Sequence, residues 1–530
     1  MDRDPRWWKH GLLYQVYPRS FQDADGDGIG DLDGVSARLD HLAWLGVDAI
    51  WLNPVHPSPN RDWGYDVADY LDVAPDLGGV AALDRLIEAA ARHGIRVILD
   101  LVPNHTSDRH PWFLDALSGR EAQHRDWYVW ADPAADGGPP NNWRSTFGGP
   151  AWTLDRASGQ YYLHNFLSQQ PDLNWWNEDV RDAFDEILRA WFDRGVAGFR
   201  IDVANAIVKD RLLRDDPASD PAGLDLATTE ERLEIYSMHR PEVHEVLRRW
   251  RAIADAYEPQ RVLIGETWAR DLPELARYYG GGEELHLAFN FAFATSPFEA
   301  PALRTVIDAT GRALGADAWP LWAASNHDIG RLATRWAGGD ASRVRCALFV
   351  LLMLRGTPVL YAGDEIGLND VPVPAARRRD EGAGPDGQGR DAGRTPMPWT
   401  SEVDGGFTAP GVEPWLPLGG GTSVREQHDD AGSVLHWCRR LIRERRDRVD
   451  LRGGKQRLLD APDGVLAWRR GASTAVAANL SPVPVRVELA GTVVLATEPS
   501  REGRSMGGEL EPWGCVVVTD PRGEGRHTRS

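Results

Sequence analysis

Cysteine is scarce in this chain of 530 residues, and long apolar runs are missing. The three cysteines, Cys346, Cys438 and Cys515, lie far apart. Their odd number and wide spacing match neither a disulfide framework nor a metal-binding cysteine motif. No stretch of about 18 apolar residues occurs, so we expect no membrane span. The first residues lack the basic and apolar segments of a secretory signal, which favours a cytoplasmic location.

Positive charge is also under-represented. Lysine and arginine number 59 together, against 79 aspartates and glutamates, and the only lysines are Lys9, Lys209 and Lys455. The net charge of −20 argues against a nucleic-acid partner, because binding to phosphates requires basic patches. A small neutral ligand is compatible with this charge. The apolar share of 42% and the charged share of 26% are typical of a soluble globular protein.

Short apolar runs alternate with amphipathic stretches along most of the chain. The helical periodicity of residues 81–93 ends at Gly94, a favourable residue for a helix C-terminus. The run that follows is rich in β-branched residues, as expected for a buried parallel strand. This alternation predicts an α/β protein, and eight such units close into a (β/α)8 TIM barrel. The predicted barrel strands are residues 11–16, 47–52, 95–102, 196–202, 261–265, 319–325 and 357–361.

Three segments break this alternation. Residues 105–174, rich in aromatic residues, glycine and proline, are too long for a simple loop, so we predict an inserted subdomain (a B domain) after the third barrel strand. Residues 369–393 lack periodicity and predict a long surface loop near the mouth of the barrel. From about residue 455, short alternating segments predict a C-terminal antiparallel β-sandwich domain, with strands at residues 465–469, 474–479, 483–489 and 515–519. The predicted division is a catalytic barrel (residues 1–104 and 175–450), the B domain (105–174) and the C-terminal β domain (451–530).

Three acidic residues, Asp202, Glu266 and Asp328, lie where predicted strands end. In a barrel, the carboxyl ends of the strands form the catalytic face, so these side chains are expected to meet there. A retaining glycosidase needs one carboxylate as nucleophile and another as acid/base, about 5–5.5 Å apart. A single acidic residue at a strand end is more often a helix cap or an ion-pair partner. Three at equivalent positions favour catalysis.

Other polar residues accompany these carboxylates. Arg200 lies two residues before Asp202 on the same predicted strand, so both side chains face the same side. Its guanidinium would keep Asp202 ionised and oriented. His105 and His327 also follow strand ends and are candidate donors to sugar hydroxyls, and Asp100 would brace the site.

These motifs resemble those of the α-amylase superfamily (glycoside hydrolase family thirteen), and within it the α-glucosidase and oligo-1,6-glucosidase branch. The matching segments are residues 100–105 (DLVPNH), 170–174 (QPDLN), 198–203 (GFRIDV), 265–268 (GETW), 326–328 (NHD) and 394–399 (RTPMPW). The last has Pro398 where many relatives have glutamine. The resemblance runs from about Trp8 into the C-terminal domain, and the motifs together are highly specific.

The resemblance implies a role for each matching position. Asp202 is similar to the nucleophile, Glu266 to the general acid/base, and Asp328 to a third carboxylate that binds the sugar and distorts its ring. Arg394 resembles the partner of Asp62 at the far edge of the glucose. The glucose-binding residues implied in this way are Asp62, Tyr65, His105, Phe147, Phe166, Arg200, His327 and Arg394.

The implied activity is exo-acting hydrolysis of α-glucosidic bonds at the non-reducing end of short oligosaccharides, of the maltose or isomaltose type. It proceeds through a covalent glucosyl–aspartate and needs no organic cofactor.

The acidic segment of residues 23–31 (DADGDGIGD) matches an EF-hand-like calcium loop, with Gly28 at its sharp turn. The expected ligands are the carboxylates of Asp23, Asp25, Asp27 and Asp31 and the backbone carbonyl of Ile29. Gly34 stands where such loops carry a bidentate glutamate, so the ion would need another oxygen donor or more water. The resemblance supports a structural Ca²⁺ at this loop, and an acidic turn without metal is the alternative.

Glucosyl transfer or sugar isomerisation, on sucrose- or trehalose-type substrates, is an alternative function on the same scaffold. Some sucrose isomerases carry an Arg-Leu-Asp-Arg run near the entrance, which this sequence lacks. Non-catalytic relatives, such as heavy-chain subunits of amino-acid transporters, depart at the catalytic positions and carry a membrane span, unlike this chain. In related enzymes Val at the position of Val203 often accompanies α-1,6 cleavage, but residues 204–210 look unlike the common α-1,6 enzymes. The linkage preference therefore stays open, and the sequence predicts no oligomeric state.

Overall fold

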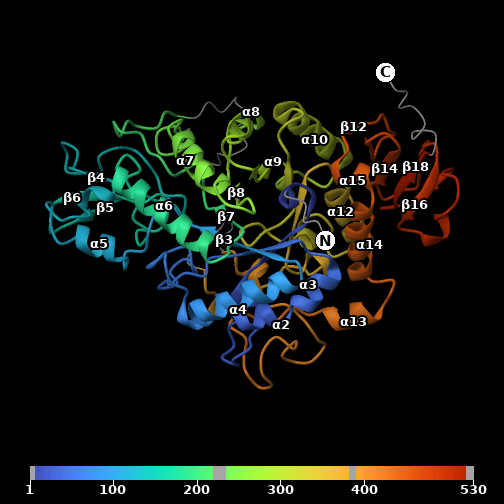
Figure 1. The fold of residues 1–530 in the computed structure, drawn as a ribbon, viewed down its shortest axis with the longest axis horizontal. Helices are drawn as coiled ribbons and strands as arrows, with labels where there is room; N and C mark the ends of the chain where they lie inside the picture. Colours follow the sequence, from blue (N-terminus) through green and yellow to red (C-terminus); the bar gives the residue numbers. More distant parts are fainter. Residues whose placement is uncertain (1–5, 219–233, 381–388, 521–530) are drawn as a thin grey trace.

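A closed parallel sheet of eight strands lies at the centre of the molecule (Figure 1). The computed structural model describes residues 6–218, 234–380 and 389–520, and in these residues the strand order is β10-β11-β1-β2-β3-β7-β8-β9. A parallel bridge between Phe289 and Leu321 connects the two outer strands, which closes the sheet into a barrel. The strands are β1 (Leu13–Val16), β2 (Ala49–Leu52), β3 (Arg96–Leu101), β7 (Gly198–Ile201), β8 (Val262–Gly265), β9 (Leu287–Ala288), β10 (Leu321–Ala323) and β11 (Thr357–Tyr361).

The predicted TIM barrel is confirmed, and all seven strands expected from the sequence are present. The eighth strand, β9, has only two residues, too few to produce a periodic signal. The predicted helix at residues 81–93 is α4 (Gly79–Arg92), which buries Leu83, Leu86 and Ala90. Gly94 follows it with a φ of +75°, a conformation that glycine adopts without steric strain.

Helices surround the barrel and connect its strands. None of those in the described ranges is both long and apolar enough to cross a membrane. Besides α4, they are α1 (Trp7–His10), α2 (Leu32–Ala37), α3 (Leu39–Leu45), α6 (Glu178–Asp193), α7 (Val243–Asp255), α8 (Leu272–Arg277), α9 (Phe291–Ala294), α10 (Ala300–Leu314), α11 (Leu332–Arg335), α12 (Ala341–Met353), α13 (Val424–Asp429), α14 (Val434–Asp447) and α15 (Val449–Gly453).

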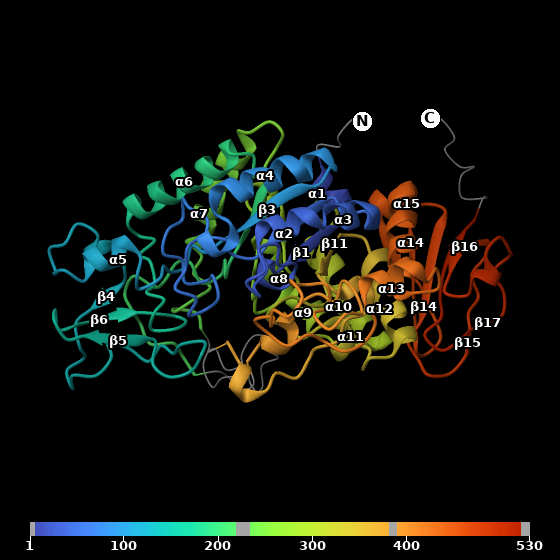
Figure 2. The same cartoon turned by 90° about the horizontal axis from the view of Figure 1, so that it is seen from below.

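The segment between β3 and α6 forms a separate small sheet. Its strands β4 (Trp130–Ala131), β5 (Trp152–Asp155) and β6 (Gln160–Leu163) are antiparallel, and α5 (Pro111–Ala116) packs nearby. An antiparallel bridge between His105 and Asp172 brings the end of the segment back to its beginning. This sheet and the C-terminal strands lie at opposite ends of the molecule (Figures 1 and 2).

The C-terminal residues form two antiparallel sheets, as predicted. The larger has the order β12-β13-β14-β18-β16 and the smaller pairs β15 with β17. Alternate residues of β13 face opposite sides: Val465 and Ala467 pack toward the smaller sheet, whereas Leu466 and Trp468 belong to the main core beside the barrel. The strands are β12 (Gln456–Leu458), β13 (Val465–Arg470), β14 (Thr474–Asn479), β15 (Val485–Arg486), β16 (Thr492–Ala496), β17 (Glu509–Leu510) and β18 (Cys515–Thr519).

Candidate active site

Arg200 lies at the centre of a group of buried carboxylates at the carboxyl ends of the barrel strands. Its Nη1 lies 2.7 Å from Oδ1 of Asp100 and 2.7 Å from Oδ1 of Asp202, and its Nη2 lies 2.7 Å from Oε2 of Glu266. These residues come from β3, β7 and β8 or directly follow them, and the three strands are neighbours in the sheet. A single guanidinium therefore holds the predicted nucleophile beside the predicted acid/base.

Two further donors fix Glu266. The backbone N–H of Val203 donates to its Oε2 at 3.0 Å, and the indole N–H of Trp268 donates to its Oε1 at 3.0 Å. Val203 has a φ of +34°, an uncommon conformation for a β-branched residue that costs about 1–3 kcal/mol. In this conformation the backbone N–H of Val203, the residue after the predicted nucleophile, points at the carboxyl of Glu266.

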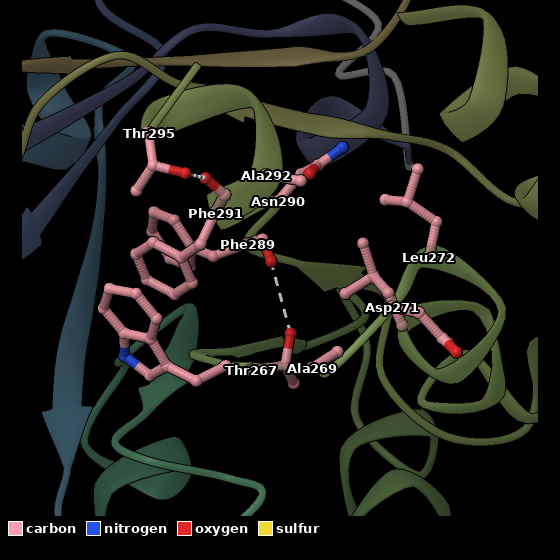
Figure 3. Close-up of a pocket in the computed structure, with 11 residues that line it drawn as sticks. Thr267, Ala269, Asp271, Leu272, Phe289, Asn290, Phe291, Ala292 and Thr295 are labelled. Atoms are coloured by element: carbon pink, nitrogen blue, oxygen red, sulfur yellow. Dashed lines mark hydrogen bonds between the residues drawn. The ribbon is translucent and has the colours of Figure 1, made fainter. Parts of the chain in front are cut away.

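A small cavity borders the segment that follows Glu266 (Figure 3). Its volume is about 20 Å³, enough for about one water, and its walls include Thr267, Phe289 and Phe291. Figure 3 shows the hydroxyl of Thr267 directed at the carbonyl of Phe289, to which it donates at 3.3 Å. The indole of Trp268 stacks on Phe291, with ring centroids 3.8 Å apart. The cavity is too small for a sugar, but the stacked rings hold the indole that donates to Glu266.

Asp328 is held by two arginines and a histidine. Its Oδ1 lies 2.9 Å from Nη2 of Arg394 and 3.0 Å from Nη1 of Arg390, and its Oδ2 lies 3.0 Å from Nε2 of His327. Burial alone would raise the pKa of Asp328, but these neighbours hold it below its usual value. Asp328 is therefore ionised at neutral pH and suited to accept hydrogen bonds from sugar hydroxyls.

His327 and Tyr65 link Asp328 to Asp100. Burial lowers the pKa of His327 well below its usual value, so the ring is neutral. The side-chain N–H of Gln15 donates to Nδ1 of His327 at 2.8 Å, which leaves the ring hydrogen on Nε2. This Nε2 lies 2.7 Å from the hydroxyl of Tyr65, which donates to Oδ2 of Asp100 at 3.0 Å. His327 is thus a donor on the side of Asp328 and Tyr65.

Asp62 contacts both Arg390 and Gln170 beside these residues. Nη2 of Arg390 lies 2.6 Å from Oδ1 of Asp62, and the side-chain N–H of Gln170 donates to Oδ2 of Asp62 at 3.0 Å. The sequence predicts Arg394 as the partner of Asp62. The structure gives this contact to Arg390, whereas Arg394 contacts Asp328.

Aromatic rings complete the group. The ring of Phe166 lies 5.2 Å from that of His105 and 5.9 Å from that of Phe147, and the guanidinium of Arg390 lies 5.5 Å from Phe147. The side-chain nitrogen of Gln170 lies 3.0 Å from Nε2 of His105. Every residue predicted to be catalytic or glucose-binding is therefore part of one connected group, although their roles stay predictions.

Protonation in this group is shared. Burial raises the pKa of Asp100 to about 7 and raises the pKa of Asp202 well above its usual value, although Arg200 opposes both shifts. Three carboxylates around one guanidinium cannot all ionise without a large electrostatic cost. At Asp202 burial therefore outweighs Arg200, contrary to the expectation that this guanidinium keeps the carboxyl ionised, and the group of carboxyls keeps at least one proton near neutrality.

The sequence alone predicts no role for Arg390 or Gln170. Arg390 belongs to the loop predicted at residues 369–393, and its contacts with Asp62 and Asp328 confirm that this loop reaches the site. Its position four residues before Arg394 places both arginines at one short 3-10 turn, Asp391–Arg394. The RTPMPW segment begins at Arg394 and does not include Arg390. The four-residue spacing between the two arginines is therefore the sequence feature that could have identified Arg390.

The acidic loop brings three of its aspartates together. Carboxylate oxygens of Asp23, Asp25 and Asp27 lie within 4.8 Å of one another. Burial raises the pKa of Asp25, and the neighbouring charge of Asp27 raises it further. Clustered oxygen donors of one charge fit a hard divalent cation such as Ca²⁺.

Asp31 is not part of this cluster of three. Its carboxylate caps α2, because Oδ1 accepts from the N–H of Gly34 at 2.7 Å and Oδ2 accepts from the N–H of Ala24 at 2.8 Å. Calcium binding at this loop, with Asp31 and the carbonyl of Ile29 as further ligands, stays a prediction.

Comparison with known proteins assigns the chain to a family. A family model described as the catalytic domain of α-amylase matches residues 15–454, and one described as a domain of unknown function matches residues 454–517. The chain is 42% identical to a probable α-glucosidase of Rhizobium meliloti (strain 1021), over 88% of this chain and 87% of that protein. It is 36% identical to an oligo-1,6-glucosidase of Parageobacillus thermoglucosidasius, over 83% of this chain and 84% of that protein.

Solved structures agree with this assignment. The α-glucosyl transfer enzyme XgtA is 38% identical, with a TM-score of 0.90 over 97% of this chain and 99% of that one. The trehalulose synthase MutB from Pseudomonas mesoacidophila is 31% identical, with a TM-score of 0.89 over 97% of this chain and 99% of that one. The fold, the carboxylates at the strand ends and these similarities lead to one conclusion: the chain belongs to the α-amylase family and is a glycoside hydrolase.

Proposed function

We propose that the chain is a retaining, exo-acting α-glucosidase that hydrolyses short oligosaccharides from the non-reducing end. The observation that carries this proposal is the contact of one guanidinium, that of Arg200, with both Asp202 and Glu266 at 2.7 Å. Retaining enzymes hold their two carboxyl groups about 5–5.5 Å apart, whereas inverting enzymes separate them by about 6.5–9.5 Å to admit a water. Two carboxylates that share one guanidinium suit the retaining arrangement.

The proposed reaction has two displacements. In the first, a carboxylate oxygen of Asp202 bonds to the anomeric carbon, the glycosidic C–O bond breaks, and Glu266 gives its proton to the leaving oxygen. In the second, Glu266 takes a proton from a water whose oxygen bonds to the same carbon, and the ester bond to Asp202 breaks. Ionised Asp328 would bind hydroxyls of this glucose and stabilise the positive charge that develops on its ring.

Exo-action would follow if one end of the site is closed. The pair of Asp62 and Arg390 lies beside the rings of Phe147 and Phe166. We infer that they leave room for a single glucose beyond the scissile bond. The chain would then release one glucose per cleavage.

Substitution of each carboxylate tests the proposal. Asp202→Asn should lower turnover of an aryl α-glucoside by several orders of magnitude, because no bond to the anomeric carbon can form. Glu266→Gln should lower turnover of maltose by about 10²–10⁴-fold, and turnover of an aryl glucoside less, because an acidic phenol leaves without a proton. Asp40→Asn, at a carboxylate whose side chain is 96% exposed, is the matched control. Near-normal turnover in either active-site variant would contradict the proposal.

Glucosyl transfer or sugar isomerisation is the second candidate, favoured by the similarity to XgtA and MutB. Both reactions share the steps up to the covalent intermediate and differ in the acceptor. Products formed at high concentrations of maltose or sucrose separate the candidates. Free monosaccharides indicate hydrolysis, whereas longer oligosaccharides indicate transfer and rearranged disaccharides indicate isomerisation.

The linkage preference depends on the aglycone side of the site. Val203 directly follows the nucleophile, and one such side chain shifts a preference by about 1–3 kcal/mol. Rates on maltose, isomaltose, sucrose and trehalose measure this preference. A strong preference for isomaltose would support Val203 as a determinant of α-1,6 cleavage, and a preference for maltose would reject it.

A further inference from the structure

Lys209 is buried, in a chain that has only three lysines. Its side chain is 3% exposed, whereas Lys9 is partly exposed and Lys455 is exposed. Its ammonium donates to Oδ1 of Asn104 and to the backbone carbonyl of Ala206, the latter at 2.6 Å. It also lies 2.8 Å from Oδ2 of Asp172. The ammonium therefore has two hydrogen-bond acceptors and one ion-pair partner.

These contacts join three segments beneath the site. Asn104 follows β3, Asp172 ends the inserted segment, and Lys209 lies in the connection after β7, which also supplies the nucleophile. The side-chain N–H of Asn104 donates to Oδ1 of Asp172 at 3.1 Å, and the backbone N–H of Asn165 donates to the same oxygen at 3.0 Å. The ammonium thus lies where the inserted segment returns to the barrel.

Lys209 and Asp172 together determine how Asn104 is oriented. An ammonium has no acceptor, so the amide oxygen of Asn104 must face it, and the amide nitrogen must face His105. That nitrogen lies 3.0 Å from Nδ1 of His105, which therefore accepts a hydrogen bond. Burial lowers the pKa of His105, so the ring is neutral and carries its hydrogen on Nε2. This Nε2 lies 3.1 Å from the backbone carbonyl of Tyr65.

The other tautomer of His105 fits less well. It could accept from the side chain of Gln170, 3.0 Å from Nε2. However, it would place two N–H groups against each other at Asn104 and a lone pair against the carbonyl of Tyr65. The contacts therefore favour a ring whose N–H faces the carbonyl of Tyr65, and a sugar hydroxyl could replace this carbonyl as acceptor.

We propose that Lys209 is a positioning residue for glucose binding. Through Asn104 it sets the hydrogen of His105 on Nε2, and through Asp172 it anchors the return of the inserted segment. This inference rests on the proposed function, in which His105 donates to a hydroxyl of the glucose. A compact ammonium with three donors fits these acceptors, whereas a planar guanidinium requires another geometry, so Lys209→Arg should not preserve the network.

A charge-neutral pair of substitutions separates positioning from stability. Lys209→Met leaves Asp172 buried and unpaired, so the midpoint of thermal unfolding should fall, and kcat/KM for an aryl α-glucoside should fall about 100-fold. Lys209→Met combined with Asp172→Asn removes both charges and should recover much of the midpoint but not kcat/KM. Lys455→Met, at an exposed lysine, is the control and should change neither. Recovery of kcat/KM together with the midpoint would show a merely structural role and overturn the proposal.

A double-mutant cycle tests whether Lys209 affects kcat/KM through His105. In a His105→Ala background, Lys209→Met should lower kcat/KM far less than it does in the wild type. Full additivity of the two effects would overturn the proposal. A wild type that turns over no α-glucoside would instead overturn the proposed function. The same cycle measured on the unfolding midpoint would then still report whether Lys209 and His105 are coupled.

Discussion

Arg390 offers the sharpest single test of the active-site geometry. Arg390→Met removes a guanidinium that lies 2.6 Å from Asp62, 3.0 Å from Asp328 and 2.7 Å from Asp380. Removal of one partner from a buried ion pair costs about 3–5 kcal/mol, because the remaining charge is left uncompensated. Asp328 keeps its contact with Arg394, whereas Asp62 keeps the neutral side chain of Gln170, so Asp62 should lose more.

The expected effect on catalysis follows from this cost. If about 3–4 kcal/mol is lost from transition-state binding, kcat/KM falls about 10²–10³-fold, since about 1.4 kcal/mol corresponds to tenfold. The assay is the initial rate on an aryl α-glucoside, with circular dichroism to confirm folding. Arg379→Met, at an exposed arginine of the same loop, is the matched control. A folded Arg390→Met enzyme with near wild-type kcat/KM would refute the reasoning.

The value of kcat/KM should decline above about pH 7, because burial raises the pKa of Asp100 to about 7 and the carboxylate group loses its shared proton there; a profile flat to about pH 9 would count against this. If Ca²⁺ is present at a hundred times its Kd, a chelator should remove about 2.7 kcal/mol from the free energy of unfolding and so lower the midpoint of thermal unfolding. Asp25→Asn should remove this response to the chelator. An unchanged midpoint would reject calcium binding. Burial lowers the pKa of His286 from 6.5 to about 3, so between these values the unfolded chain binds a proton that the folded chain does not. The free energy of unfolding should therefore decrease as pH falls below 6.5, by up to about 1.4 kcal/mol per unit for this group, and His286→Asn should reduce the slope in urea titrations at several pH values.

The carboxylates of the site could be predicted because each requires only local information. An apolar run identifies the strand, and the residue that follows it must lie at the carboxyl end. Parallel pairing then aligns Asp100 with Arg200 and brings Arg200 beside Ile264, two residues before Glu266. No tertiary detail was needed to expect that these side chains meet.

Other features could not be predicted because they depend on distant partners. Arg390 lies in a loop without periodicity, and its role arises only when the loop folds over Asp62. Asp31 has the spacing of a calcium ligand, but the same carboxylate is also a good helix cap, and the sequence does not weigh one use against the other. Lys209 reads as an ordinary surface charge until Asn104 and Asp172 are placed around it.

The backbone conformation of Val203 lowers stability but supports catalysis. Glycine adopts a φ of +34° without the steric strain that valine has there. Replacement of Val203 by glycine should therefore stabilise the folded state. Glycine would also loosen the peptide N–H that donates to Glu266 and would remove the branched side chain that directly follows the nucleophile in the chain. A laboratory selection for thermostability alone should therefore accumulate changes at this peptide unit that weaken catalysis, whereas selection for activity should restore a branched residue.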